Sequence, residues 1–436
     1  MTPDRAAASK VIVVGAGAAG LAAADALRRA GAAVVIVEAR DRIGGRVDSR
    51  IDPSLGIAVE RGAEFVHGRP PRITALARRS GAPVRAVPER HVARRGGRQQ
   101  PVDGAFEEAQ RLLSLGQRDD ETFEAALARN GGPRRLGAGT VELAREFVRG
   151  FYLADPATAS AGALRRMTEG LGETGGATPH RVVGGYARLL APLARGLRAR
   201  GAIRLSCPVE EIRWRPGAVE VRVRGAAGGP LPPLRAARVI VTAPLGVLQA
   251  GALRFRPSLP GLARAAAALE MGPIVKVILR FRSGAWPPRG TGRLSFLHVP
   301  GAPVPVFWTL APLSAPALVG WAGGPHARAL AGRSERAVAA AAVRSVARGL
   351  ALSPAAVEDA LDAVDAIDWT ADPWARGGYA VFPAGSAGAS EALARPVAGT
   401  LFFAGEATAD PAGAGTVEGA LASGERAARE ALDSLR

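Results

Sequence analysis

A glycine-rich segment near the start of the chain is the first place where residue type and spacing predict chemistry. Gly15, Gly17 and Gly20 form G-A-G-A-A-G between an apolar run and a helical pattern. Such a turn lets a pyrophosphate reach the N-terminus of a helix without an intervening side chain. Glu38 stands 18 residues after Gly20, where a carboxylate is expected to bind a ribose hydroxyl. The combination predicts dinucleotide binding but does not distinguish FAD from NAD.

The second candidate is a lysine inside an apolar strand pattern. The chain has 57 lysines and arginines, of which only Lys10 and Lys276 are lysine. Lys276 lies in I-V-K-V-I, so it either reaches solvent from a sheet edge or is buried for a reason. A buried lysine offers a compact donor with a tunable charge state that arginine lacks. We therefore interpret Lys276 as a functional residue.

Cysteine and histidine usage argues against two other kinds of site. The single cysteine, Cys207, excludes an intramolecular disulfide framework and argues against a cysteine-based metal cluster. Four of the five histidines, His91, His180, His298 and His326, show no metal-ligand spacing, so we expect no metal.

The glycine motif and Glu38 must be positioned by a strand, turn, helix, strand unit over residues 10–38. Its strands, at 11–14 and 34–37, are nearly continuous apolar runs, as expected in a parallel sheet covered on both faces. The helix is expected at 21–29. At the other end of the chain, 401–404 predicts a strand and 416–432 a long helix in the same style.

The middle of the chain differs in character. Residues 70–173 have a mostly helical pattern that Gly and Pro residues interrupt. The pattern of 182–205 predicts a helix followed by a strand. Further strands are expected at 219–223, 239–242 and 275–281. With 436 residues, two domains in one chain are the natural expectation. The simplest arrangement is a dinucleotide-binding domain interrupted twice by a second domain.

Composition and charge limit the partners. The formal charge of +18 is compatible with nucleic-acid binding, but the arginines are scattered, and the densest group, Arg90, Arg94, Arg95 and Arg98, has no interleaved aromatic residues. No run approaches the roughly 20 apolar residues of a membrane span, and residues 1–10 lack the apolar core of a secretory signal. We expect a cytoplasmic protein with no nucleic-acid or membrane partner.

The segment that begins at Glu38, E-A-R-D-R-I-G-G-R-V, is the first of several motifs that resemble those of a known family. It is followed in order by R-G-A-E-F-V-H-G at 61–68, P-V-E-E-I at 208–212, V-T-A-P-L-G-V-L at 241–248, M-G-P-I-V-K-V at 271–277, W-T-A-D-P-W-A-R-G-G-Y at 369–379 and F-F-A-G-E-A-T at 402–408. The chain resembles the flavin-containing amine oxidase family, which includes monoamine oxidases, polyamine oxidases, histone-lysine demethylases and L-amino acid oxidases. Residues 80–180 carry no matching motif.

The resemblance implies non-covalent FAD in a Rossmann-like domain of the type with two dinucleotide-binding motifs, interleaved with a mixed α+β substrate-binding domain. The implied boundaries are 1–80, 182–250 and 375–436 for the first domain, and 81–181 with 251–374 for the second. The implied cofactor-binding residues are Gly15, Gly17, Ala18, Ala19, Gly20, Glu38, Ala39, Arg40, Gly45, Arg46, Gly62, Ala63, Glu64, Phe65, Val209, Gly405, Glu406, Thr416 and Val417.

Three residues are implied at the reacting centre. Lys276 matches a lysine that holds a water near the flavin, and Tyr379 matches one wall of an aromatic cage. The opposite wall is Thr416 here, so a two-tyrosine cage is absent. His67 resembles a substrate-side histidine of polyamine oxidases; a loop histidine bound to backbone is an equal alternative. Gly378 stands where covalently flavinylated members have cysteine.

The implied reaction is hydride transfer from the carbon beside an amine nitrogen to FAD. The resulting imine hydrolyses, and O₂ reoxidises the flavin to give H₂O₂. An L-amino acid is the main alternative substrate, because one of many arginines could bind its carboxylate. The alternatives outside this chemistry are a flavin-dependent desaturase or dehydrogenase that does not act on amines, an NAD dehydrogenase and a basic nucleic-acid-binding protein.

The candidates for the pocket wall are Phe307, Trp308 and Trp321, with core packing as the default. The sequence is silent on oligomeric state.

Overall fold

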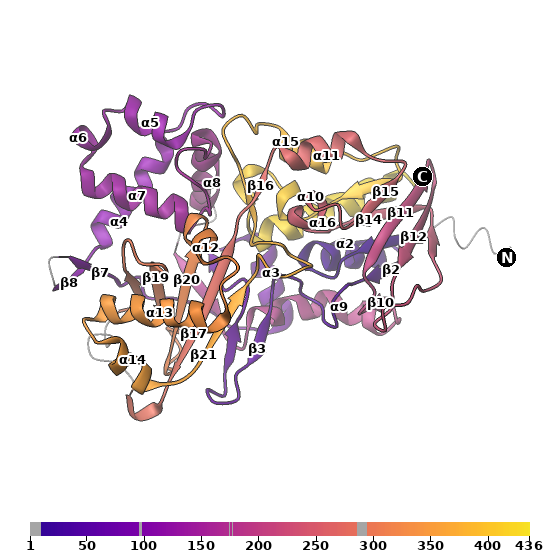
Figure 1. Ribbon diagram of the computed structural model, residues 1–436. Helices are drawn as coiled ribbons and strands as arrows, with labels where there is room; N and C mark the ends of the chain where they lie inside the picture. The colour runs from indigo at the N-terminus through magenta and orange to yellow at the C-terminus, as the bar shows by residue number, and fades with distance from the viewer. Residues whose placement is uncertain (1–9, 96–97, 174, 177, 286–293) are drawn as a thin grey trace.

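The computed structural model describes residues 10–95, 98–173, 175–176, 178–285 and 294–436. Residues 1–9, which carry most of the segment tested for a secretory signal, lie outside this set, as do Gly96 and Gly97 in the arginine-rich segment. Helices and strands are mixed along the described chain (Figure 1), so the predicted α/β class is confirmed in this coarse form.

A parallel sheet carries the glycine-rich turn. Within the described residues its strands run in the order β10, β2, β1, β14, β23, and every neighbouring pair is parallel. Their bounds are Ile203–Arg204, Ala33–Val37, Lys10–Val14, Arg238–Val241 and Leu401–Phe403. Val11, Val239 and Leu401 have no exposed surface, because helices and a second sheet cover the two faces. The predicted strand, helix, strand unit is confirmed.

Two helices from opposite ends of the chain pack on this sheet. They are α2, Ala18–Arg29, and α16, Val417–Asp433, and they lie side by side (Figure 1). α2 begins three residues earlier than predicted. A Cβ at Gly424 of α16 would collide with the backbone of Ala19 in α2. Small residues therefore let the C-terminal helix approach the helix that follows the glycine turn.

A larger sheet of mixed direction lies on the other side of the molecule (Figure 1). Its described strands run in the order β21, β17, β20, β19, β18, β7, β8. Their bounds are Leu361–Asp368, Ile274–Phe281, Ala317–Gly323, Val306–Thr309, Phe296–His298, His91–Arg95 and Arg98–Pro101. Only the β18 and β7 pair is parallel. Helix α13, Glu335–Leu350, buries its apolar side against this sheet.

The prediction that residues 70–173 are mostly helical is wrong for the stretch from 84 to 101. Residues 84–101 contain β6, Val84–Ala86, and the hairpin of β7 and β8. These strands are rich in arginine and have weak local strand preference. They are set by distant partners, since β7 pairs with β18, about 200 residues away, and β6 pairs with β9, Pro179–Val182. The remainder of the segment is helical, as predicted.

The other strands form smaller sheets. The order β13, β12, β11, β15 uses Leu234–Ala236, Ala218–Val223, Val209–Arg215 and Arg254–Arg256. The order β5, β9, β6 includes β5 at Phe65–His67. Two-stranded pairs join β3, Ser49–Ile51, to β4, Ala58–Glu60, and β16, Glu270–Met271, to β22, Ala380–Val381.

The remaining helices have the following bounds. They are α3 Pro71–Ser80, α4 Asp103–Leu112, α5 Phe123–Arg129, α6 Gly132–Leu136, α7 Ala138–Gly150, α8 Ala161–Glu173, α9 Ala191–Arg198, α10 Leu245–Gln249, α11 Pro260–Ala267, α12 Pro325–Leu330, α14 Pro354–Ala360 and α15 Ala389–Ala394. Short 3-10 helices lie at Leu113–Leu115, Tyr186–Leu190, Ser283–Ala285, Glu406–Thr408 and Pro411–Gly413.

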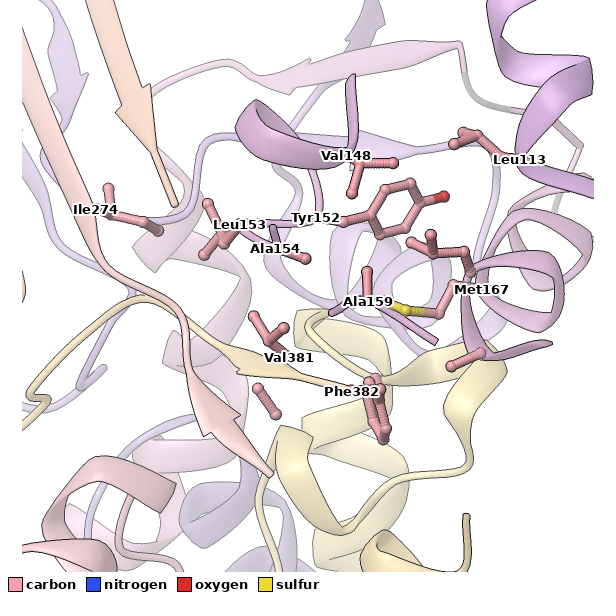
Figure 2. Close-up of a cluster of buried hydrophobic side chains, with 14 of the residues drawn as sticks. Leu113, Val148, Tyr152, Leu153, Ala154, Ala159, Met167, Ile274, Val381 and Phe382 are labelled. Atoms are coloured by element: carbon pink, nitrogen blue, oxygen red, sulfur yellow. The ribbon is translucent and has the colours of Figure 1, made fainter. Parts of the chain in front are cut away.

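A buried cluster attaches helices α4 to α8 to the rest of the molecule. Figure 2 shows Tyr152 lying between Val148 and Met167, while Val381 and Phe382 approach from another segment. The Tyr152 hydroxyl and the Thr168 hydroxyl lie 3.0 Å apart, and burial raises the pKa of Tyr152 to about 12. The helical layer is therefore packed against strands that also border the site described next. The domain boundaries stay a prediction.

Candidate functional site

A single large cavity brings the predicted site residues together. Its volume is about 1240 Å³, above the roughly 300–1,000 Å³ usual for small-molecule sites, so it has room for a dinucleotide and a substrate. The predicted residues that line it are Gly15, Gly17, Ala18, Ala19, Glu38, Ala39, Arg40, Gly45, Arg46, Gly62, Ala63, Glu64, Phe65, His67, Val209, Lys276, Tyr379, Gly405, Glu406, Thr416 and Val417. Gly20 is the predicted residue that does not.

The N-terminus of α2 has the features of a phosphate site. Its N-cap residue is Gly17, which provides no side-chain hydrogen bond, and its first turn contains no acidic residue. The first amide groups of a helix have no partner within the helix, and the helix dipole places partial positive charge there. Gly17, Ala18 and Ala19 line the cavity at this point, so the residues present fit a pyrophosphate.

Gly20 contributes by packing. A Cβ on this residue would collide with the carbonyl oxygen of Gly15 and would lie 3.2 Å from the hydroxyl oxygen of Thr242. The absence of a side chain therefore lets α2 approach the turn that follows β1. Gly15 itself has φ +103°, a conformation that favours glycine.

Glu38 is held by the same turn. Its carboxylate accepts hydrogen bonds from the amides of Ala16 at 2.6 Å and Arg40 at 2.9 Å. Burial raises the pKa of Glu38, and these two amides oppose that effect. The side chain lies at the end of β2 and lines the cavity, which is the location expected for a ribose contact.

Arg40 and Arg46 have carboxylate partners that the sequence did not suggest. Arg40 forms two hydrogen bonds with Asp372, at 2.7 and 2.8 Å, and its guanidinium lies 5.8 Å from the centre of the Trp369 ring. Arg46 donates to Glu406 at 2.7 Å and to the carbonyl of Gly378 at 2.6 Å. Both arginines line the cavity with their charges already paired.

Thr416 caps the C-terminal helix. Its hydroxyl accepts a hydrogen bond from the Gly419 amide at 2.9 Å and donates to the Gly413 carbonyl at 2.6 Å. The hydroxyl thus satisfies the first turn of α16, while Thr416 and Val417 border the cavity. The predicted start of a long helix at Thr416 agrees with α16, whereas the role of Thr416 and Val417 in cofactor binding stays a prediction.

Lys276 is buried and bound to a carboxylate. It is 1 % exposed, and its Nζ donates to Glu64 Oε2 at 2.5 Å and to the Gly62 carbonyl at 3.1 Å. The alternative of a lysine reaching solvent from a sheet edge is therefore wrong, because β17 is flanked by β20 and β21.

Glu64 also contacts two residues that sequence reasoning did not connect with it. Its Oε1 accepts hydrogen bonds from Arg181 at 2.5 Å and from the Trp308 indole at 2.9 Å. Burial raises the pKa of Glu64, but the charges of Lys276 and Arg181 outweigh burial and leave that pKa below its ordinary value. No local motif marks Arg181, which is one arginine among many.

Tyr379 lies against a wall of small residues. Its hydroxyl donates to the Phe151 carbonyl at 2.5 Å, and burial raises its pKa. A Cβ at Gly415, where φ is +72°, would lie 3.2 Å from the Tyr379 ring. Ala412, Gly413, Ala414 and Gly415 all line the cavity, so space is left beside the ring.

The remaining aromatic wall combines predicted and unpredicted residues. His67 lines the cavity with its ring 5.4 Å from that of Phe151, in an edge-on arrangement. Trp308 and Trp321 also line it, whereas Phe307 is buried on the opposite face of its strand against α13. Strand alternation explains the difference between Phe307 and Trp308, since neighbouring side chains point to opposite faces.

A histidine pair lies at the same cavity. His91 Nδ1 and His298 Nε2 are 2.9 Å apart, and the His91 ring stacks on Phe296 at 4.6 Å. Burial lowers the pKa of His298 to about 3, and the adjacent His91 contributes to the shift. His298 is therefore neutral at physiological pH and acts there as a hydrogen-bonding group.

A buried carboxyl close to this site should make stability depend on pH. Burial raises the pKa of Glu60 from 4.5 to about 7, despite hydrogen bonds from Ser49 and the Tyr186 amide. Between these two values the native carboxyl holds a proton that the unfolded chain has released, so stability falls as pH rises through this window. The loss is about 3 kcal/mol, at about 1.4 kcal/mol per pKa unit.

The measurement is urea unfolding at a series of pH values from about 4.5 to about 8, for the wild type and for Glu60→Gln. Glutamine keeps the size of the side chain and an acceptor for the Tyr186 amide. We expect the variant to have a flatter pH dependence across the window. Parallel curves for the two proteins would contradict the assignment of this dependence to Glu60.

Comparisons with known proteins agree with the geometry. The sequence profile described as flavin containing amine oxidoreductase matches residues 18–432. Human lysine-specific histone demethylase 2 is 29 % identical over 466 aligned residues, covering 96 % of this chain and 53 % of the relative. Polyamine oxidase 3 of Oryza sativa subsp. japonica is 30 % identical, covering 96 % of this chain and 88 % of the relative. The chain spans about half the length of the first demethylase relatives.

Solved structures share the fold. Wild-type putrescine oxidase bound to putrescine has a TM-score of 0.80 at 23 % identity, with 98 % of this chain and 99 % of that chain covered. Cyclohexylamine oxidase from Brevibacterium oxydans IH-35A has a TM-score of 0.77 at 23 % identity, with 98 % and 100 % covered. At this identity the likeness concerns fold alone.

Among the described residues, no helix has the length and apolar character needed to cross a membrane. No group of three or more histidine, cysteine, aspartate or glutamate side chains in that part of the chain is arranged to hold a metal ion.

Proposed function

The chain belongs to the flavin-containing amine oxidoreductase family, and from this membership we propose that it is an FAD-dependent oxidase of amines that carry no carboxylate. The observation that supports the proposal is a single cavity lined at one end by the uncapped N-terminus of α2 and elsewhere by Lys276 and Tyr379. A cofactor site and a reacting centre would thereby share one cavity.

The residues that would hold FAD are those already found around the cavity. The first amides of α2 would bind the pyrophosphate, Glu38 the ribose, and Thr416 with Val417 would border the flavin side. FAD would supply the acceptor for a hydride from the α-carbon of the amine and return the electrons to O₂. The cofactor is non-covalent in this proposal. A side chain at Gly378, where other family members attach the flavin, would collide with Ile274.

The chain's own groups would orient the substrate and exclude water. Tyr379 is fixed by its hydrogen bond to the Phe151 carbonyl, so its ring can present an electron-rich face to an amine. Phe65, Phe151 and Trp308 add an apolar wall on which the rest of an amine can pack. Lys276 would hold a water in the cavity, which suits hydrolysis of the imine product. His67 is proposed to contact the substrate.

The partners of the arginines at the cavity bear on the choice between an amine and an L-amino acid as substrate. An amino acid oxidase needs an arginine positioned to bind the substrate carboxylate. The described arginines that line the cavity are Arg40, Arg46 and Arg348. The first two pair with Asp372 and Glu406, and Arg348 donates to the carbonyls of Val299 and Pro300. This arrangement favours an amine over an amino acid.

The charge of the protein bears on the choice among amines. A formal charge of +18 disfavours the encounter with a polycation at low ionic strength. Together with the aromatic wall, this favours an amine with one apolar substituent over a polyamine. The names of the relatives, polyamine oxidase and putrescine oxidase, make diamines and polyamines the alternative to test.

The test is anaerobic bleaching of the flavin absorbance at about 450 nm, followed by admission of air. The panel contains apolar monoamines, putrescine and spermidine, and L-amino acids. We expect an apolar monoamine to bleach the flavin fastest, with recovery of colour and release of peroxide in air. Bleaching by L-amino acids alone would contradict the proposed substrate class. A yellow protein that no member bleaches would refute amine oxidation and favour a desaturase or another dehydrogenase.

Two less direct predictions accompany this function. We propose that residues 1–80, 182–250 and 375–436 form the FAD-binding domain and that 81–181 and 251–374 form the substrate-binding domain. A cytoplasmic location and the absence of nucleic-acid and membrane partners also stay predictions. If the protein does not bind immobilised DNA even at low ionic strength, the predicted absence of a nucleic-acid partner is supported.

A further inference from the structure

Glu64, Lys276, Arg181 and Trp308 form a buried cluster whose members come from separate parts of the chain. Glu64 precedes β5, Arg181 lies in β9, Lys276 in β17 and Trp308 in β19. The side chains of Glu64, Lys276 and Arg181 are 3 %, 1 % and 5 % exposed. Both carboxylate oxygens of Glu64 accept hydrogen bonds, one from Lys276 and the other from Arg181 and Trp308.

Arg181 is anchored independently of Glu64. Its Nε donates to the Ala311 carbonyl at 3.0 Å and its Nη2 to the Thr309 carbonyl at 3.3 Å, while its guanidinium lies 5.2 Å from the centre of the Phe65 ring. The guanidinium is therefore a rigid support, and the Glu64 carboxylate is held on it with Trp308 as a third contact. The fixed carboxylate in turn determines where the Lys276 ammonium lies.

The interior of a protein disfavours an unpaired charge. Transfer of an ammonium group into the interior favours the neutral amine, whereas an opposite charge within about 4 Å favours the ammonium. Glu64 provides that charge at 2.5 Å. Arg181 acts in the opposite direction on Lys276, because it is a second positive charge on the same carboxylate. Glu60 on β4 is the other carboxyl whose charge acts on the pair.

The described contacts use two of the three ammonium protons, one on Glu64 and one on the Gly62 carbonyl. Lys276 also lines the cavity, so the third proton is available to a group inside it. An amine that had lost its proton would offer one N–H fewer and no charge. The charge state of Lys276 therefore decides whether this residue acts as a fixed donor or as a base.

We propose that Glu64, supported by Arg181 and Trp308, is a positioning residue that keeps Lys276 as a fixed ammonium at the wall of the cavity. The residue then acts as a permanent hydrogen-bond donor and positive charge beside the FAD site. Such a charge stabilises negative charge that develops there as the amine is oxidised. The use made of the charge rests on the proposed function, whereas the charge itself does not.

The chain allows a direct test, because it has only two lysines, Lys10 and Lys276. The holoprotein is labelled with carbon-13 at the lysine ε-carbons, and the Lys276 signal is identified by its absence in Lys276→Met. The chemical shift of this carbon reports the loss of the ammonium proton as pH is raised from about 6 to about 11, a range that includes the ordinary lysine value. No turnover is needed.

Three variants separate electrostatic support from simple loosening of the core. In Glu64→Gln we expect Lys276 to become neutral at a pH lower by at least about one unit, since an adjacent opposite charge shifts titration by about 1–3 units. Arg181→Met removes a competing positive charge, so the transition must not move to lower pH. Trp308→Phe removes one hydrogen bond and no charge, and we expect a change below about half a unit, less than one ion-pair contribution.

A Glu64→Gln transition within about half a unit of the wild type would overturn the proposal, as would an Arg181→Met transition at a lower pH than that of the wild type. If Glu64→Gln does not fold, the sign of the Arg181→Met change decides. The outcome is also distinct from that of the flavin-bleaching test. A protein that oxidises no amine but shows the expected shift in Glu64→Gln would refute the proposed function and support the role of Glu64.

Discussion

Replacement of Lys276 by methionine is expected to slow amine turnover by about a hundredfold to ten-thousandfold, the range in which a single positioned proton-transfer or donor group contributes to catalysis. Lys276 Nζ donates to Glu64 and to the Gly62 carbonyl, and the residue also lines the cavity. Methionine has a similar length and suits a buried site, and Arg181 still pairs with Glu64 in the variant. We therefore expect the protein to fold and to retain FAD.

The measurement is stopped-flow spectroscopy of the two half-reactions, with flavin absorbance as the signal. If Lys276 serves the steps after hydride transfer, reoxidation in air should slow more than anaerobic reduction by the amine. Lys10→Met is a matched control, because it removes the other lysine, which stands at the start of β1. Turnover of Lys276→Met within about threefold of the control, well short of the loss expected for a catalytic group, would rule out the proposed role.

Replacement of Gly20 by alanine is expected to abolish retention of FAD. The added methyl group would collide with the backbone carbonyl of Gly15 and would lie close to the Thr242 hydroxyl. Neither group is at the end of a long, flexible side chain that could move aside. Relief of the collision requires α2 to move away from the turn after β1, which displaces the amides that would bind the pyrophosphate. Overpacking of this kind costs about 1–3 kcal/mol or more.

The readout is the ratio of flavin absorbance to protein absorbance after purification, together with the thermal unfolding temperature. Gly261→Ala is the matched control, since Gly261 lies in helix α11 with no atom within 4 Å of the added Cβ. Alanine in a helix is more favourable than glycine by about 0.5–1 kcal/mol, so the control should be as stable as the wild type or more so. A yellow Gly20→Ala protein of normal stability would show that the close approach of α2 is not required.

The part of the fold around the glycine turn was predictable because its causes are local. Apolar runs at 11–14 and 34–37, a glycine pattern between them and an acidic residue at the end of the second run specify a strand, turn, helix and strand within 30 residues. The strands at 219–223, 239–242 and 275–281 follow from short-range alternation or burial in the same way. The start of α2 was misplaced by three residues, because glycine and alanine at a helix N-terminus give no capping signal.

The hairpin at 91–101 was missed for the opposite reason. Arginine, glutamine and glycine have little preference for strands, and the pairing partner of β7 is β18, about 200 residues further along the chain. Nothing within the segment contains that information. The helical prediction for 103–173 succeeded because α4, α7 and α8 each present an apolar stripe with the helical period.

Individual residues at the site were therefore identifiable from the chain, whereas their partners were not. The unusual lysine in an apolar strand pointed to Lys276, and glycine spacing pointed to the turn before α2. The tertiary structure alone decided that Lys276 meets Glu64, that Arg181 and Trp308 support Glu64, and that Arg40 meets Asp372. Each of these contacts joins residues more than 100 positions apart. The charge and hydrogen-bonding capacity of a side chain do not determine which distant group the folded backbone places next to it.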